Sequence, residues 1–205
     1  MKAGVLFDRD ATLIDVVRDE ETGKVVVAFH PNQIRLLSGA VEGLKLLRDA
    51  GYLLAIVTNQ PGPAKGEISE GAVARTNAAL VDILAKEGIT IESVAVCMHH
   101  QTGGPGGDAK LVKECECRKP RPGLLNGVID DLELSREQSW MVGDSVSDIE
   151  AGFAAGLKTA LVFSSNRCEL CPYRDGINSA KPVPHVSGAT LADIARKIIN
   201  ADFGA

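Results

Sequence analysis

The sequence lacks any long apolar run and any surplus of basic residues. Its longest apolar stretches, such as Tyr52–Val57, are far shorter than the ~20 residues that a membrane-spanning helix requires. Asp8 and Asp10 interrupt the apolar N-terminal segment, which argues against a signal-peptide core. The net charge of −5 offers no bulk electrostatic attraction to nucleic acid. These absences predict a soluble cytoplasmic protein that binds neither membranes nor nucleic acid.

The sequence also lacks internal repeats, a heptad pattern and a secreted-type cysteine framework. An odd number of cysteines, five in 205 residues, does not suggest paired disulfides. The chain is 45% hydrophobic and 24% charged, as expected for an ordinary globular protein. We therefore expect one domain over residues 1–205. Without a heptad or another sign of an interface, we also expect a monomer.

Short apolar runs alternate with longer amphipathic segments along the chain. The runs are continuously apolar, which is typical of buried parallel strands. They are Ala3–Phe7, Leu53–Val57, Val94–Cys97, Trp140–Val142 and Thr159–Val162. The helices predicted between and after them cover Gly39–Ala50, Ser69 to about Lys86, Gly123–Leu132, Ser147–Ala155 and Thr190–Asn200. The alternation predicts an α/β fold, a Rossmann-like and mostly parallel sheet flanked by helices. The charged segment Asp15–Pro31 predicts an excursion or a hairpin near the site.

Acidic residues follow two of the predicted strands. Asp8 and Asp10 lie two apart, so they project to the same side if strand geometry persists. Asp144 follows a later strand, and Asp148 stands four residues further on at a helix start. Each acid alone could simply end a strand or serve a helix N-terminus. Together, at strand ends where α/β sheets bind ligands, they favour a magnesium site, because Mg²⁺ prefers oxygen ligands.

Four motifs resemble those of the haloacid dehalogenase (HAD) superfamily, in the same order. They are Phe7-Asp8-Arg9-Asp10-Ala11-Thr12-Leu13, Thr58-Asn59-Gln60, Lys119-Pro120, and Gly143-Asp144 with Asp148. The resemblance implies a phosphatase in which Asp8 is the nucleophile and forms an aspartyl-phosphate. It implies that Asp10 protonates the leaving alkoxide and then activates water. The same resemblance implies two sets of binding residues. These are Thr58, Asn59 and Lys119 for the substrate, and Asp8, the carbonyl of Asp10, and Asp144 for Mg²⁺.

Two positions depart from the family pattern. The family usually has glycine at position 11, and Ala11 fits there only if its φ is negative. Close relatives commonly have lysine where this chain has Ser145. These departures keep open a second hypothesis, a non-catalytic relative that uses the fold for binding. The retained Asp8 and Asp10 favour an enzyme.

Cysteine and histidine gather in a separate loop over about residues 97–117. Cys97 and His99, followed by Cys115 and Cys117, form a C-x-H…C-x-C pattern that suits a structural, tetrahedral Zn²⁺ site. Free cysteines in a solvated loop are the alternative, and His100 competes with His99 as a ligand.

The loop resembles the zinc-binding loop of D,D-heptose 1,7-bisphosphate phosphatases and histidinol-phosphate phosphatase domains, which favours His99. In that resemblance, zinc holds Arg118 and Lys119 towards the substrate.

The resemblance implies a small phosphorylated metabolite as substrate. We expect no large cap domain, because the chain is short, and an open site would then admit a sizeable sugar phosphate. A sugar bisphosphate such as D-glycero-D-manno-heptose 1,7-bisphosphate suits Arg118, Lys119 and Lys65; histidinol phosphate is the alternative. A further C-x-x-C pair, Cys168 and Cys171, is compatible with a redox, metal-binding or structural role.

Overall fold

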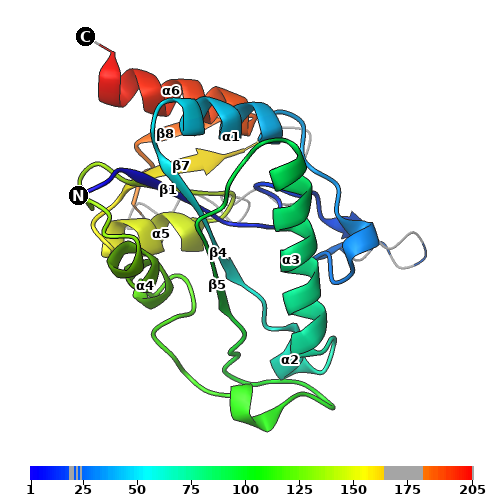
Figure 1. The fold of residues 1–205 in the computed structure, drawn as a ribbon. Coiled ribbons are helices and arrows are strands. Elements are labelled where there is room, and N and C mark those ends of the chain that lie inside the picture. The colour runs from blue at the N-terminus through cyan, green and yellow to red at the C-terminus, as the bar shows by residue number, and fades with distance from the viewer. Residues whose placement is uncertain (19–20, 22, 24, 164–181, 205) are drawn as a thin grey trace.

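A six-stranded parallel sheet forms the centre of the computed structural model, which describes residues 1–18, 21, 23, 25–163 and 182–204 (Figure 1). Every pair of neighbouring strands in this sheet is parallel. The spatial order is β5 (Ser93–Cys97), β4 (Leu53–Asn59), β1 (Gly4–Phe7), β6 (Trp140–Gly143), β7 (Lys158–Val162) and β8 (Val186–Gly188). The predicted fold class is confirmed.

Helices cover both faces of the sheet. In β1, the side chains of Val5 and Phe7 join one hydrophobic cluster and Leu6 joins the other, as strand geometry requires. The first cluster includes side chains from α1 (Ala40–Asp49), α3 (Glu70–Lys86) and α6 (Leu191–Phe203). The second includes side chains from α4 (Gly123–Asp131) and α5 (Val146–Ala154). Because both faces are covered, the central strands can be apolar throughout.

The helix boundaries follow capping chemistry that is visible in the sequence. The hydroxyl of Ser69 accepts a hydrogen bond from the N–H of Ala72 and caps α3. Thr190 and Asp193 form a reciprocal capping box at the start of α6. The last helix continues to Phe203, three residues beyond the predicted end.

The sequence did not predict the shortest helices and strands. Strand β8 has only three residues, Val-Ser-Gly, and lies at the sheet edge beside β7, so it carries no apolar run. Helix α2 (Gly62–Lys65) and the 3-10 helices η1 (Pro31–Gln33) and η2 (Ala109–Leu111) are single turns. The charged segment does contain a hairpin, in which β2 (Val17–Arg18) pairs antiparallel with β3 (Val25–Val26).

The C-terminal helix is attached to the amino-terminal edge of the sheet through Asp202. Its carboxylate accepts hydrogen bonds from Tyr52 Oη (2.6 Å), Trp140 Nε1 (2.8 Å) and Lys158 Nζ (2.5 Å). Burial opposes the charge of Asp202, but these three donors lower its pKa below the ordinary value. One carboxylate thus joins α6 to the residues that begin or precede three strands.

The topology brings the predicted site residues to one edge. Strand β1 lies between β4 and β6, and the parallel strands end on the same side. Asp8, Asn59 and Asp144 therefore gather at the carboxyl edge, where α/β sheets bind ligands. Among the described residues, no helix is long and apolar enough to cross a membrane. Cys168 and Cys171 lie outside the described residues.

Candidate active site

Asp8 lies directly after β1. Its backbone N–H donates to the carbonyl of Val142 on β6 (2.9 Å), which extends the strand pairing through Asp8. Its side chain is 13% exposed. Burial raises the pKa of Asp8 to about 7; Lys119 opposes this shift, while Asp148 and Asp10 add to it. The environment therefore favours neutralisation of this carboxylate, by a proton or by a cation.

Lys119 provides a buried cation beside Asp8. Its Nζ lies 2.7 Å from Asp8 Oδ1 and 2.6 Å from Asp148 Oδ1, and it donates to the carbonyl of Val57 (2.8 Å). Burial by itself would lower the pKa of Lys119, but Asp148 and Asp8 raise it above its ordinary value. The ammonium therefore remains charged throughout the physiological range.

The second motif positions Lys119 through its backbone. Asn59 Oδ1 accepts from the N–H of Lys119 (3.2 Å), and Asn59 Nδ2 donates to the Lys119 carbonyl (3.1 Å). The sequence pattern placed Asn59 among the substrate-binding residues, whereas its amide in the structure is engaged with this backbone. Thr58 is buried, and its hydroxyl accepts from Gln60 Nε2 (2.9 Å).

Asp148 serves the start of a helix, one of the roles considered from the sequence, and also pairs with a cation of the site. Its Oδ2 accepts from the hydroxyl (2.6 Å) and the N–H (3.1 Å) of Ser145, which forms the capping box of α5. Its Oδ1 pairs with Lys119. Gly143 permits this arrangement, because a Cβ at that position would lie 2.4 Å from Asp148 Oδ2. Ser145, the departure from the family pattern, thus orients an acid of the site.

Three carboxylates form a group that could hold a metal ion. Asp8, Asp144 and Asp148 each offer an oxygen, and these oxygens lie within 4.8 Å of one another. Burial, followed by repulsion from Asp8 and Asp148, raises the pKa of Asp144 to about 8. When all three acids are ionised, the ammonium of Lys119 leaves two negative charges unbalanced. An all-oxygen set with this charge suits a hard divalent cation.

Asp10 is held by two residues that the sequence reading did not single out for this role. Gln60 Nε2 donates to Asp10 Oδ2 (2.7 Å), and Arg9 forms an ion pair with the same oxygen (3.0 Å). Arg9 is only 1% exposed. An arginine between two aspartates resembles a surface residue in the sequence. The available signal was its position two residues after a buried strand, where a charge needs a partner.

Ala11 adopts a φ of 60°. The condition under which alanine would fit, a negative φ, is therefore not met. The chain turns sharply here, because the N–H groups of Leu13 and Ile14 both donate to the Arg9 carbonyl and Ala11 donates to Ile14. An alanine in this left-handed region costs about 1–2 kcal/mol.

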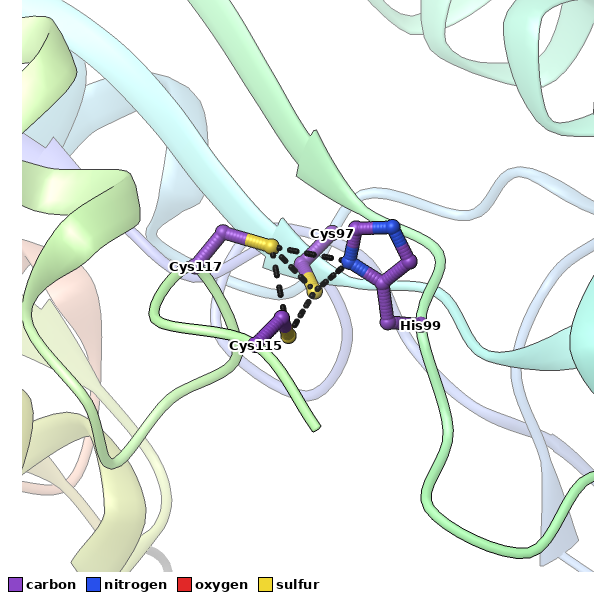
Figure 2. Close-up of side chains that lie close together, drawn as sticks. All are labelled: Cys97, His99, Cys115 and Cys117. Carbon is purple, nitrogen blue, oxygen red and sulfur yellow. Dashed lines mark hydrogen bonds between the residues drawn. The ribbon is translucent and has the colours of Figure 1, made fainter. Parts of the chain in front are cut away.

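Cys97, His99, Cys115 and Cys117 converge on one point, as Figure 2 shows. Five separations among their sulfurs and His99 Nδ1 run from 2.9 to 3.8 Å. Tetrahedral zinc with ordinary bond lengths places such ligands about 3.5–3.8 Å apart. Burial raises the pKa of Cys97 and Cys117, so a bound cation would have to displace their protons.

His100 lies outside this cluster. Its Nδ1 accepts from the N–H groups of Thr102 (3.3 Å) and Gly103 (3.1 Å). Of the two histidines considered from the sequence, His99 is the one whose ring faces the cysteines.

A cavity of about 410 Å³ lies between the cysteine loop and Lys119. Its lining carries four cationic residues and one acid, Lys113, Arg118, Lys119, Arg121 and Glu114, and Glu114 pairs with Arg121. The Nζ of Lys119 is buried against Asp8 and Asp148. Arg118 donates to the carbonyl of His99 (3.3 Å), which ties the cavity wall to the cysteine–histidine cluster.

Comparison with known proteins supports one family. Residues 116–170 match the HAD-hydrolase-like family model. The D-glycero-beta-D-manno-heptose-1,7-bisphosphate 7-phosphatase of Pasteurella multocida is 34% identical over 167 residues, which cover 82% of this chain and 84% of that relative. The protein of the same name from Haemophilus influenzae is 33% identical over 159 residues, covering 77% and 79%.

Solved structures share the fold. The D,D-heptose 1,7-bisphosphate phosphatase from B. bronchiseptica, complexed with magnesium and phosphate, has a TM-score of 0.74 at 24% identity, covering 98% of this chain and 99% of that chain. The enzyme of that name from Burkholderia thailandensis has a TM-score of 0.63 at 19% identity, covering 97% and 99%. Fold and sequence together define a HAD-like hydrolase. The chain belongs to the HAD-like phosphatases, which are phosphomonoester hydrolases.

The strained alanine gives a first prediction. Ala11→Gly should raise the free energy of unfolding by about 0.5–1 kcal/mol, because relief of the positive-φ strain exceeds the added entropy of the unfolded chain. Urea denaturation measures the change. The control is Ala78→Gly on the exposed side of α3, which should lose about 1 kcal/mol. Destabilisation by both substitutions would contradict the strain at Ala11.

The crowded carboxylates give a second prediction. Asp144 titrates near 8 in the folded protein against 3.8 ordinarily, so the folded state retains a proton that the unfolded chain has lost. Without Mg²⁺, this group's contribution to the free energy of unfolding falls as pH rises from about 4 to about 8. Relative to the wild type, the free energy of unfolding of Asp144→Asn should therefore rise by about 1 kcal/mol or more between about pH 5 and pH 8.

Denaturation midpoints of both proteins at the two pH values measure this difference, in which titrating groups that do not interact with Asp144 cancel. Added Mg²⁺ at the higher pH should stabilise the wild type more than the variant. Parallel pH profiles would show that Asp144 is not crowded.

Proposed function

We propose that this chain is a Mg²⁺-dependent phosphatase acting on a sugar bisphosphate such as D-glycero-D-manno-heptose 1,7-bisphosphate. The observation that carries the reaction type is the buried ammonium of Lys119 between Asp8 and Asp148, beside Asp144. The similarity to the heptose-1,7-bisphosphate 7-phosphatases of Pasteurella multocida and Haemophilus influenzae supports the substrate. Histidinol phosphate is the second candidate, considered from the resemblance of the cysteine loop.

In the proposed reaction, a carboxylate oxygen of Asp8 forms a bond to phosphorus as the bond to the leaving oxygen breaks. Asp10 gives its proton to that leaving oxygen. Asp10 then takes a proton from water, whose oxygen attacks phosphorus while the bond to Asp8 breaks and phosphate leaves. Lys119 and Thr58 bind the phosphoryl oxygens, and the fixed ammonium stabilises the charge that develops on them.

The proposed magnesium ligands are Asp8, the carbonyl of Asp10, and Asp144, with Asp148 beside them. Their all-oxygen character and unbalanced charge fit the ion, and the magnesium and phosphate named in the B. bronchiseptica structure support it. Bound Mg²⁺ would neutralise the repulsion between Asp8 and an incoming phosphate. Asp8 would then remain an anion at neutral pH despite its raised pKa.

The cationic cavity supports a bisphosphate as substrate. It adjoins Lys119, and Arg118 lines its wall. We propose that Arg118 contacts the substrate, as the family resemblance implies. A second phosphate in this cavity would gain charge-assisted hydrogen bonds that a monophosphate cannot form. This difference favours a sugar bisphosphate over histidinol phosphate.

For the second metal site we propose Zn²⁺, bound by Cys97, His99, Cys115 and Cys117. Three thiolates and one imidazole complete a tetrahedron and leave no open position, so the role is structural. Cys117 lies two residues before Lys119, and zinc would therefore fix the segment that carries the catalytic cation. We further propose that residues 1–205 act as one monomeric domain, since both core clusters lie on a single sheet.

Phosphate release tests the reaction and the substrate. With Mg²⁺, the wild type should hydrolyse heptose 1,7-bisphosphate with the highest kcat/KM in a panel that includes both anomers and histidinol phosphate. Asp8→Asn should lose at least about 10³-fold in kcat, because it removes the nucleophile. The control is Asp131→Asn, an exposed acid on α4, which should leave turnover unchanged.

Retained turnover in Asp8→Asn would refute the nucleophile. A higher kcat/KM for histidinol phosphate would replace the proposed substrate while leaving the reaction type in place.

Elemental analysis tests the zinc site. The purified protein should contain about one equivalent of zinc, and Cys115→Ser and Cys117→Ser should each lose it, because three ligands bind the ion more weakly. Both variants should also unfold at a lower temperature. His100→Gln is the control, at the neighbouring histidine outside the cluster, and should retain the metal. A zinc-free protein of undiminished stability would contradict the site.

A further inference from the structure

Arg9 carries a full positive charge into the interior beside the proposed proton donor. Its side chain is 1% exposed, although it stands two residues beyond β1 between two acids. A buried guanidinium is costly unless its N–H groups find acceptors. The positions of the acceptors therefore show which groups the arginine holds in place.

Two of these hydrogen bonds go to the carboxylate of Asp10. Arg9 Nε donates to Oδ2 and Arg9 Nη2 donates to Oδ1, both at 3.1 Å. Because guanidinium and carboxylate are both planar, a two-point contact fixes the plane of the acid as well as its position. The side chain of Asp10 is 12% exposed, so part of it still faces the site.

The other contacts of Arg9 fix the guanidinium itself. Nη1 donates to Asn77 Oδ1 on α3 (2.7 Å), and Nη2 donates to the carbonyl of Ala28 (3.1 Å). Asn77 and Ala28 are both buried. The arginine is therefore anchored to a helix and to the segment after β3, and its orientation does not depend on Asp10 alone.

Gln60 completes the frame from β4. Its Nε2 donates to Asp10 Oδ2 (2.7 Å) and to Thr58 Oγ1 (2.9 Å), and the residue is 1% exposed. Asp10 thus accepts from its chain neighbour Arg9 and from Gln60, which follows β4. Because Arg9 is itself bonded to Asn77 and Ala28, the orientation of the carboxylate is set before a substrate arrives.

We propose that Arg9 is a positioning residue that orients Asp10 for protonation of the leaving oxygen, with Asn77 as its anchor. This inference rests on the proposed function, in which Asp10 is the general acid. A proton transfer of this kind contributes roughly 10²–10⁴ in rate and needs the acid within hydrogen-bond reach. Misorientation of Asp10 would reduce that contribution even though Asp10 itself is retained.

The leaving group separates this role from a purely structural one. An alkoxide leaves poorly without a proton, whereas 4-nitrophenolate leaves readily as an anion. Loss of orientation at Asp10 should therefore slow an alkyl phosphate far more than an aryl phosphate. A general loosening of the fold would slow both substrates to the same extent.

The experiment compares kcat/KM for glycerol 2-phosphate and 4-nitrophenyl phosphate in the full chain with Mg²⁺. Arg9→Gln should lose at least about tenfold more on the alkyl than on the aryl substrate, a fraction of the full general-acid contribution. In an Asp10→Asn background, Arg9→Gln should add no further difference between the two. Arg75→Gln is the control, an exposed arginine on the same helix as Asn77, and should leave both rates unchanged.

Asn77→Ser tests the same frame without touching the buried charge, and it decides the matter if Arg9→Gln fails to fold. It should also lose more kcat/KM on the alkyl than on the aryl substrate, but by a smaller factor than Arg9→Gln. Equal losses on both substrates in folded variants would overturn the role of Arg9 alone. A wild type that releases phosphate neither from these two substrates nor from heptose 1,7-bisphosphate would overturn the proposed function, and the role of Arg9 with it.

Discussion

The ammonium of Lys119 lies 2.7 Å from Asp8 and 2.6 Å from Asp148, and much of the local structure serves to place it there. Buried carboxylates this close repel one another, and a desolvated cation between them offsets the repulsion. Two separate segments, β4 and α5, hold it. Asn59 binds its backbone from β4, the Val57 carbonyl accepts from Nζ, and the capping box of α5 orients Asp148. An isolated loop could not maintain such an arrangement against side-chain entropy.

The two candidate metal sites are linked through the same segment of chain. The acid cluster offers only oxygen and the loop cluster offers sulfur and nitrogen, so hard and soft cations would separate between them. Cys117 belongs to the loop cluster, and Lys119 two residues later belongs to the acid site. In the proposed function, a metal ion bound in the loop cluster would thereby help to hold the Lys119 ammonium beside Asp8.

The neighbouring aspartates Asp8 and Asp10 differ because their partners differ. Asp8 faces Lys119 and two other acids, an environment that raises its pKa and favours a bound cation. Asp10 faces the anchored guanidinium of Arg9 and the amide of Gln60. Two identical side chains two residues apart can therefore take different parts in one reaction, which is the way enzymes divide the work of paired carboxylates.

The sequence by itself determined the class of fold, most helix boundaries and the acids of the site. Apolar runs, capping residues and motif spacing are local signals, because each can be recognised within a short stretch of sequence and agrees with the burial that the fold imposes. Only the tertiary structure decided how charges pair across segments. Each of three interactions joins residues far apart in the chain. Lys119 pairs with Asp148, Asn59 bonds to the backbone of Lys119, and the buried Arg9 bonds to Asn77. The positive φ of Ala11 likewise follows from the hydrogen bonds of a turn. Pairing of buried charges depends on distances in space, which residue spacing along the chain does not contain.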